Sequence, residues 1–133
     1  MDKLDYEVEL GVILGRDAFR VDAESADDYI FGYTPMEPCI VTADEIDNVH
    51  DLDITCYVNG EKRQSSNTGY MITTVEEAIA ELSQGMTLSA GTVIATGTPG
   101  GVGMGMKPPV YLGSGDVVRC EIENIGVMEN TVE

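Results

Sequence analysis

The sequence predicts an α+β fold that is mainly β, with two short helices, in a single domain over residues 1–133. Three observations lead to this class. Short apolar stretches that alternate or run continuously between glycine, proline and asparagine are typical of strands. Two segments have apolar residues at helical spacing instead. Strands and helices do not alternate regularly, which argues against a doubly wound parallel sheet.

The first expected strand covers Tyr6 to Leu14, where alternation gives way to a continuous apolar run that ends at Gly15. Apolar residues at helical spacing, followed by a glycine, predict a short helix over residues 21–32. A loop then leads through "YTPMEPC" to a short apolar stretch. We therefore expect a strand, a helix and a second strand in the first third of the chain.

A hairpin is expected at Asn59-Gly60, because this pair between strand-like runs suits a turn with positive φ at both positions. The second helix is expected over residues 73–85, with Thr73 and Glu76 spaced as a capping box. A buried strand from Val93 to Thr96 should enter a glycine-rich loop. Two further strands are expected around residues 124–126.

The composition limits the partners of the chain. Seven basic residues stand against 24 acidic ones, a formal charge of −17 that repels phosphate backbones and excludes nucleic acid as an expected partner. The three cysteines have no metal-ligand spacing, which favours a reducing compartment. No stretch approaches the length of a membrane span. We expect a cytoplasmic protein that does not bind membranes.

Two carboxylates stand one residue apart in "DYEVEL", at Glu7 and Glu9. In a strand they would share a face, where two charges at about 5 Å repel by roughly 3 kcal/mol at an effective dielectric near 20. Spacing alone fits a solvated face, and it also fits two ligands of one cation. Carboxylate oxygens suit Mg²⁺, Mn²⁺ or Ca²⁺ better than zinc.

The glycine-rich loop "TGTPGGVGMG" resembles a nucleotide-binding loop but lacks its defining parts. Lys107 is followed by Pro108 where a P-loop needs Ser or Thr, and no helix follows as a dinucleotide fingerprint requires. What remains is either a plain tight turn or a strand end with amides and the Thr98 hydroxyl suited to an oxyanion. The single histidine, His50, is expected at the surface or at a cap.

Several segments in order resemble the C-terminal domain of the fumarylacetoacetate hydrolase family. They are "DYEVELGVILG", "ADDYIFGYT", "PCIVTADEI", "VNGEKRQSSNTGYMI" and "LSAGTVIATGTPGGVG…PPVYLGSGDVV", which together cover nearly the whole chain. The resemblance implies a mixed, curled β-sheet roll around a metal site.

By this resemblance, Glu7 and Glu9 bind a divalent cation, Mg²⁺ with Mn²⁺ or Ca²⁺ as alternatives. Gly97 and Thr98 bind an oxygen of a small-molecule carboxylate substrate, and Thr98 is the candidate catalytic residue. The implied activity is hydrolytic cleavage of a C–C bond in a β-diketo or 2-oxo acid. The alternatives are an isomerase or tautomerase, an oxaloacetate decarboxylase, or a non-catalytic remnant. Family members are commonly homodimers.

The sequence departs from the family pattern after "GYT". The family segment with the third metal-binding carboxylate and a substrate-binding lysine has no counterpart between Thr34 and Pro35. The family's N-terminal part with a catalytic His–Glu pair is also not found, and His50 does not align with that histidine. The domain is therefore expected to be incomplete, with a junction near residues 34–35. Either a longer protein supplies these parts, or the chain is a remnant that binds metal weakly.

Overall fold

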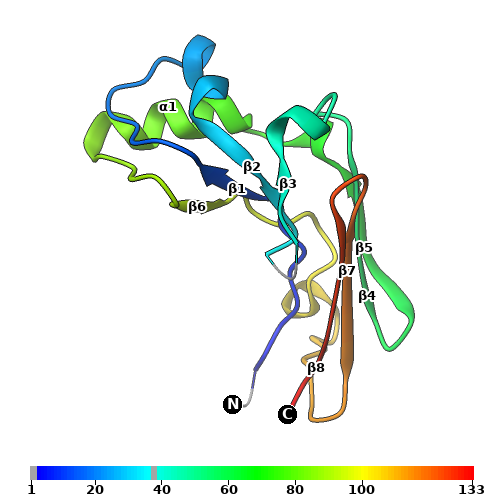
Figure 1. Ribbon diagram of the computed structural model, residues 1–133. Coiled ribbons are helices and arrows are strands. Elements are labelled where there is room, and N and C mark those ends of the chain that lie inside the picture. The colour runs from blue at the N-terminus through cyan, green and yellow to red at the C-terminus, as the bar shows by residue number, and fades with distance from the viewer. Residues whose placement is uncertain (1–2, 37–38) are drawn as a thin grey trace.

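The strands of the computed structural model, which describes residues 3–36 and 39–133, form two four-stranded antiparallel sheets (Figure 1). The first sheet has the order β3-β2-β1-β6 and the second β5-β4-β7-β8. The strands are β1 (Gly11–Leu14), β2 (Ile30–Thr34), β3 (Val41–Thr42), β4 (Asp53–Val58), β5 (Glu61–Asn67), β6 (Val93–Ala95), β7 (Val117–Ile122) and β8 (Gly126–Thr131).

The mainly β, α+β class is confirmed by this architecture. Within it, every pairing among these strands is antiparallel, where a mixed sheet was expected. Short turns require antiparallel pairing of β4 with β5 and of β7 with β8, whereas β1 with β6 and β4 with β7 are antiparallel pairs of strands far apart in sequence. The predicted hairpin at Asn59-Gly60 is confirmed, with φ of 52° and 80° at the two residues.

The one α-helix among the described residues is α1 (Val75–Gly85), which lies over the first sheet (Figure 1). Its capping box uses Thr74 and Glu77 rather than Thr73 and Glu76: the Glu77 N–H donates to Thr74 Oγ1 at 3.2 Å. The run "TTVEE" contains both spacings, so sequence alone is ambiguous by one residue. The helix expected over residues 21–32 is a 3₁₀ helix, Ala23–Tyr29, and β2 begins directly after it.

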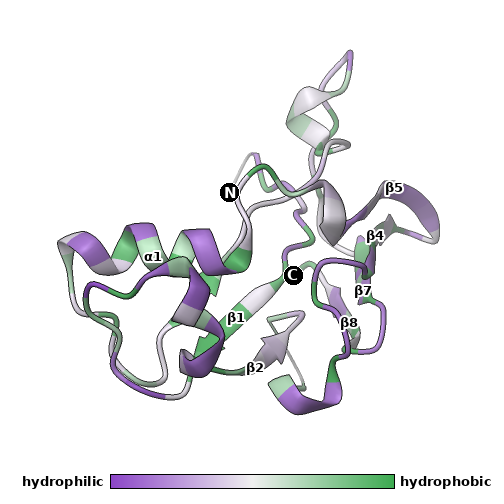
Figure 2. Ribbon diagram, turned by 90° about the horizontal axis from the view of Figure 1, so that it is seen from above, coloured by the Kyte–Doolittle hydropathy of each residue, from purple (hydrophilic) through white to green (hydrophobic). Residues whose placement is uncertain are grey.

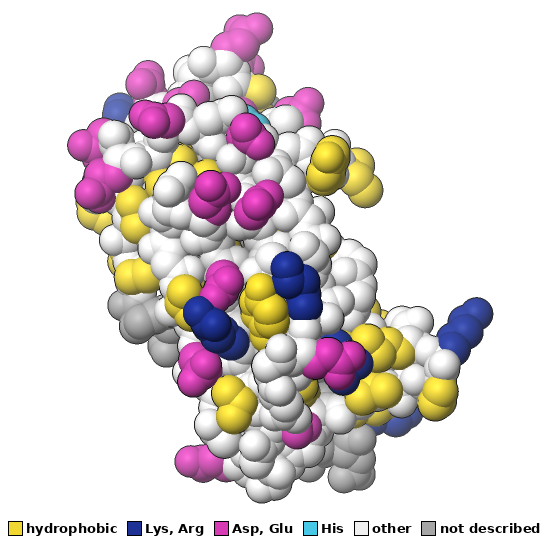
Figure 3. Space-filling model, turned by 90° about the vertical axis from the view of Figure 1, so that its right-hand side faces the viewer, with side chains coloured by type: hydrophobic (Ala, Val, Ile, Leu, Met, Phe, Trp, Pro, Cys, Tyr) yellow, Lys and Arg dark blue, Asp and Glu magenta, His cyan; other side chains and the backbone are white. Residues whose placement is uncertain are grey.

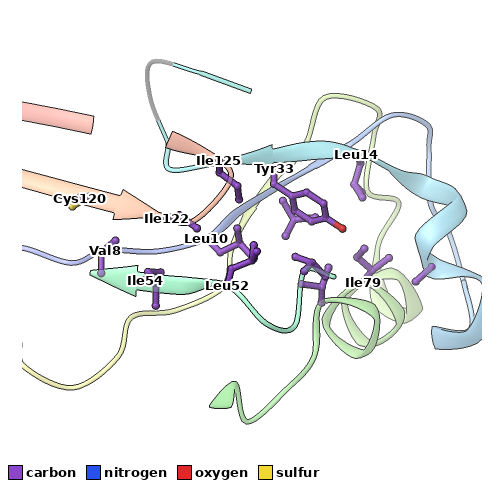
Figure 4. Close-up of a cluster of buried hydrophobic side chains, with 14 of the residues drawn as sticks. Val8, Leu10, Leu14, Tyr33, Leu52, Ile54, Ile79, Cys120, Ile122 and Ile125 are labelled. Atoms are coloured by element: carbon purple, nitrogen blue, oxygen red, sulfur yellow. The ribbon is translucent and has the colours of Figure 1, made fainter. Parts of the chain in front are cut away.

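The hydrophobic core lies between the two sheets and under α1 (Figure 4). Leu52, Ile54 and Ile122, which lie in or next to β4 and β7 of the second sheet, meet Val8 and Leu10 from the N-terminal segment (Figure 4). Burying two such aliphatic side chains is worth about 1.5–3 kcal/mol each, so the core anchors the segment that carries Glu7 and Glu9. In Figure 2, β5 is mostly hydrophilic, in agreement with its sequence EKRQSSN.

The strand expected to be buried at Val93–Thr96 is instead the exposed edge strand β6. Val93 is 47% exposed, and β1 is the one strand among the described residues that pairs with β6. Its apolar composition therefore reflects β propensity rather than burial on both faces.

The charges of the surface are unevenly distributed. Carboxylates gather over the upper part of the face in Figure 3, whereas most of the Lys and Arg side chains on this face lie further down, where further carboxylates stand among them. In the part of the chain that the structure describes, no helix has the length and apolarity needed to cross a bilayer.

Candidate metal and oxyanion site

Residues 5–10 are extended but belong to no strand, so the expected strand from Tyr6 to Leu14 is correct only for Gly11–Leu14. Burial nevertheless alternates as in a strand. Tyr6, Val8 and Leu10 are each 3% exposed or less, while Glu7 is exposed and Glu9 half-buried. The apolar side chains enter the core, and the two glutamates therefore point away from it on a common face.

Side chains from distant elements satisfy the backbone of this segment in place of a neighbouring strand. Val8 N–H donates to Gln64 Oε1 at 3.1 Å, and Val8 O accepts from the Thr98 hydroxyl at 3.0 Å. Leu10 O accepts from the hydroxyl of Thr96 at 2.9 Å. Leu10 O also accepts from the Thr96 backbone N–H at 3.2 Å, so backbone pairing with β6 reaches Leu10 and side chains take over at Val8.

The carboxylates of Glu7 and Glu9 lie side by side. Partial desolvation, a hydrogen bond with the Glu9 carboxyl, and repulsion by Glu9 and Asp5 raise the pKa of Glu7 above its ordinary value. Two carboxylates that meet in this way disfavour their joint ionisation and favour a shared cation. Exposure of Glu7 leaves the pair open to solvent.

The glycine-rich loop is joined directly to this pair. Gly97 N–H donates to Glu9 Oε2 at 3.1 Å, so the structure brings together the residues predicted at both ends of the site. The Thr98 hydroxyl donates to Val8 O and accepts from Gln64 Nε2 at 2.8 Å. Its single proton is therefore used inside the protein, and the hydroxyl retains only acceptor capacity towards a ligand.

Asp5 organises the second half of the loop, a role that sequence reasoning missed. Its Oδ1 accepts from Gly103 N–H at 2.7 Å and its Oδ2 from Met104 N–H at 2.7 Å. The partners lie 98 and 99 residues away, so no local pattern could have revealed them. Asp5 is committed to backbone amides rather than to the glutamate pair.

A pocket of about 520 Å³ lies against the glycine-rich loop. Its walls are mainly the loop and the segment that follows β5, and none of the described residues that line it is charged. The lining residues are Leu10, Ile54, Ser66, Asn67, Thr68, Tyr70, Met71, Ile72, Thr73, Thr96, Gly97, Thr98, Pro99 and Gly100. Gly97 and Thr98 thus border the pocket while they contact the glutamate segment.

His50 belongs to a different cluster. Its side chain is 34% exposed, and its Nε2 lies 2.8 Å from Glu76 Oε1 at the N-terminus of α1, so this partly exposed histidine also pairs with a carboxylate. Burial raises the pKa of Glu76, but hydrogen bonds from His50 and from its own backbone outweigh this and lower it. Burial and the nearby Glu76 raise the pKa of Asp27.

The described residues contain no group of three His, Cys, Asp or Glu side chains placed to hold a metal ion. Glu7 and Glu9 therefore fit a divalent cation as two of its ligands, and the other positions would need water or substrate oxygens. Met36 lies close to this segment, since its Sδ is 2.9 Å from the place a Cβ on Gly11 would occupy. Gly11 follows Glu9 by two residues on the same face.

A family model described as fumarylacetoacetate (FAA) hydrolase C-terminal matches residues 1–37 and 34–133. The chain belongs to the fumarylacetoacetate hydrolase family. The two matched stretches meet around the expected junction. The sequence is also 38% identical to an uncharacterized protein of Staphylococcus saprophyticus over 158 residues and 40% identical to one of Staphylococcus aureus over 154. The alignments include 98% and 96% of this chain but 52% and 51% of those proteins, so the chain spans about half of their length.

Solved structures of fumarylacetoacetate hydrolase family proteins superpose closely. A fumarylacetoacetate hydrolase from Exiguobacterium antarcticum matches with a TM-score of 0.96 and 41% identity, over 100% of this chain and 57% of that one. Maleylpyruvate hydrolase from Sphingobium sp. SYK-6, in complex with manganese and pyruvate, matches with a TM-score of 0.89 and 31% identity. The match covers 98% of this chain and 54% of that one. A probable 2-hydroxyhepta-2,4-diene-1,7-dioate isomerase from Mycobacterium abscessus matches with a TM-score of 0.91 and 29% identity. The match covers 99% of this chain and 61% of that one. The family thus includes hydrolases and isomerases.

Proposed function

We propose that this chain is the metal-binding domain of a divalent-metal-dependent hydrolase that cleaves a C–C bond in a 2-oxo or β-diketo acid. One observation carries the proposal: the paired carboxylates of Glu7 and Glu9 are hydrogen-bonded through Glu9 to the Gly97 amide of the glycine-rich loop. Mg²⁺ is the proposed ion, with Mn²⁺ or Ca²⁺ as alternatives. The manganese and pyruvate in the Sphingobium enzyme support a divalent metal and a 2-oxo acid for this site.

In this proposal each residue has a physical role. Glu7 and Glu9 hold the cation, which would supply Lewis-acid stabilisation of the negative charge that develops on a 2-oxo acid. The Gly97–Thr98 segment lies next to Glu9 and places its backbone beside the substrate oxygens. The uncharged pocket beside it receives the remainder of the substrate. Thr98 holds the loop against the glutamate segment rather than donating a proton to the substrate, since its hydroxyl donates its hydrogen bond to Val8 O.

Isomerisation is the second candidate activity, and the similarity to the Mycobacterium abscessus isomerase supports it. Both reactions need charge stabilisation at a 2-oxo acid, and they differ in whether a water attacks. A non-catalytic remnant is the third candidate, because only two carboxylates of the site are present among the described residues. Cytoplasmic location and a homodimer remain proposals, supported by free Cys39, Cys56 and Cys120 and by the exposed side chain of Phe31.

Metal titration tests the proposal. Isothermal titration with Mn²⁺ should show weak binding to the wild-type chain and a large loss in the Glu7→Gln/Glu9→Gln variant. The matched control is Glu24→Gln/Glu81→Gln, which removes two exposed carboxylates elsewhere and should leave binding unchanged. Equal affinity in all three proteins would reject the metal assignment.

Substrate assays then separate the activities. Acylpyruvates, oxaloacetate and hydroxymuconate-type diacids should be offered with Mn²⁺, and the products should be identified by mass spectrometry. Cleaved products support the hydrolase, decarboxylated ones the decarboxylase, and products of unchanged mass the isomerase. Metal binding without turnover of any of them would support the remnant.

A further inference from the structure

Gln64 is a buried side chain beside the candidate site whose amide makes three hydrogen bonds. It lies in β5, is 1% exposed, and uses all parts of its amide. Oε1 accepts from Val8 N–H at 3.1 Å, while Nε2 donates to Thr98 Oγ1 and to Pro99 O, both at 2.8 Å. A buried amide with both N–H groups used has one fixed orientation.

The partners of Gln64 belong to the two segments that form the site. Val8 separates Glu7 from Glu9, and Thr98 with Pro99 directly follows Gly97. The amide therefore bridges a segment 56 residues before it and a loop 34–35 residues after it. Neither segment has a strand partner at this point, whereas Gln64 is held in the sheet through its pairing with Cys56.

A second contact joins the same loop to β5. Gly101 has a φ of +113°, and a Cβ there would lie 2.2 Å from the carbonyl oxygen of Arg63 and 3.2 Å from Cγ of Gln64. The loop backbone thus packs directly against the residues around Gln64. The close approach keeps Pro99 O within reach of the Gln64 amide.

We propose that Gln64 is a positioning residue that holds the Glu7/Glu9 pair and the Gly97–Pro99 loop at a fixed separation. The inference rests on the proposed metal role of the glutamates. Without the amide, Val8 N–H would be buried without its acceptor, and the loop would lose two of its ties. The glutamate segment would then sample several positions relative to Gly97.

The experiment compares Gln64→Met with Ser83→Ala. The first keeps side-chain length and removes all three hydrogen bonds. The second removes an equally buried polar group that joins Val21 N–H to α1, away from the site. Three quantities are measured in each protein: the Mn²⁺ dissociation constant, the hydrogen-exchange rate of the Val8 amide, and the melting temperature.

Both variants should melt at lower temperature than the wild type. Only Gln64→Met should bind Mn²⁺ about 10-fold more weakly, as is typical when a residue that orients metal ligands is replaced. Only in this variant should the hydrogen of the Val8 amide exchange with solvent faster, by roughly 10-fold or more. Unchanged Mn²⁺ affinity and Val8 protection in Gln64→Met would overturn the proposal. The proposal would also be overturned if Ser83→Ala lost Mn²⁺ affinity and Val8 amide protection to the same extent as Gln64→Met.

A second variant covers a failure of Gln64→Met to fold. Thr98→Val keeps the shape of Thr98 and removes its bonds to Val8 O and Gln64. Weaker Mn²⁺ binding by Thr98→Val supports the bridge, and wild-type affinity rejects it. If the wild-type chain binds Mn²⁺ no better than Glu7→Gln/Glu9→Gln, the metal function fails and the metal part of this proposal with it. The hydrogen-exchange rate of the Val8 amide then decides separately whether Gln64 fixes the segment that carries Glu7 and Glu9.

Discussion

Gly97 donates its backbone N–H to Glu9 Oε2 at 3.1 Å, across 88 residues of sequence. This bond makes the carboxylate pair and the glycine-rich loop one site rather than two neighbouring features. The bond fixes one oxygen of the half-buried Glu9 carboxylate, while Glu7 beside it is exposed to solvent.

Removing one charge of the pair should stabilise the metal-free protein. The pKa of Glu7 is raised, so its charged form is less favourable in the folded than in the unfolded state, and stability falls as pH rises through these pKa values. Glu7→Gln should therefore unfold at higher urea concentration than the wild type at pH 7, with the difference vanishing below about pH 4, the range in which Glu carboxyls are protonated. A variant that is less stable at pH 7 would contradict the repulsion.

A carboxylate at position 36 should strengthen metal binding. Met36 has φ of 82°, a left-handed conformation that Asp and Asn adopt more readily than Met, and its side chain contacts the face that carries Glu9. Met36→Asp should bind Mn²⁺ about 10-fold more tightly, because charge count tunes cation affinity. Met36→Asn has nearly the same shape without the charge, and equal Mn²⁺ affinity in the two variants would contradict the prediction.

Gly103 should tolerate no side chain. A Cβ there would lie 1.8 Å from Val110 O and 2.7 Å from Asp5 Oδ1, so the backbone would have to move. Gly103→Ala should lower the free energy of unfolding by about 2–3 kcal/mol in urea denaturation. Gly85→Ala is the control, since a Cβ at the end of α1 meets no atom within 4 Å, and it should not be destabilised.

The pair of His50 and Glu76 should make stability depend on pH. Because the pKa of Glu76 is lowered on folding, its contribution is present above about 4.5, the usual Glu range, and is lost as pH falls through the lower folded value. Glu76→Gln should cost about 0.5–1 kcal/mol at pH 6–7 and less as the pH falls below 4. Glu81→Gln on the same helix should show no such pH dependence in thermal unfolding, and a similar profile for both would contradict the pairing.

Local signals predicted the parts of the fold that depend on neighbouring residues. The Asn59-Gly60 turn and the helix over Val75–Gly85 follow from positive φ preference and apolar spacing, which tertiary contacts did not override. The pairing of Glu7 and Glu9 on one face followed from alternation. The placement of Gly97 and Thr98 beside them came only from the family resemblance.

Contacts between distant residues explain what local signals missed. The run from Tyr6 to Leu10 has strand spacing but no strand partner, because Gln64 and Thr98 bind its backbone. Val93 is apolar yet exposed, since edge position cannot be inferred from composition. Asp5 holds amides nearly a hundred residues away. None of these relationships leaves a pattern within a short window of sequence.

The connection between β2 and β3 has a consequence for the tolerance of the domain to changes in length. Because the two strands pair antiparallel, with Tyr33 opposite Val41, the ends of the connection stay close whatever its length. Doubling the length of such a loop costs only about 0.6 kcal/mol. The length and residues of this connection can therefore change while β2 and β3 keep their register.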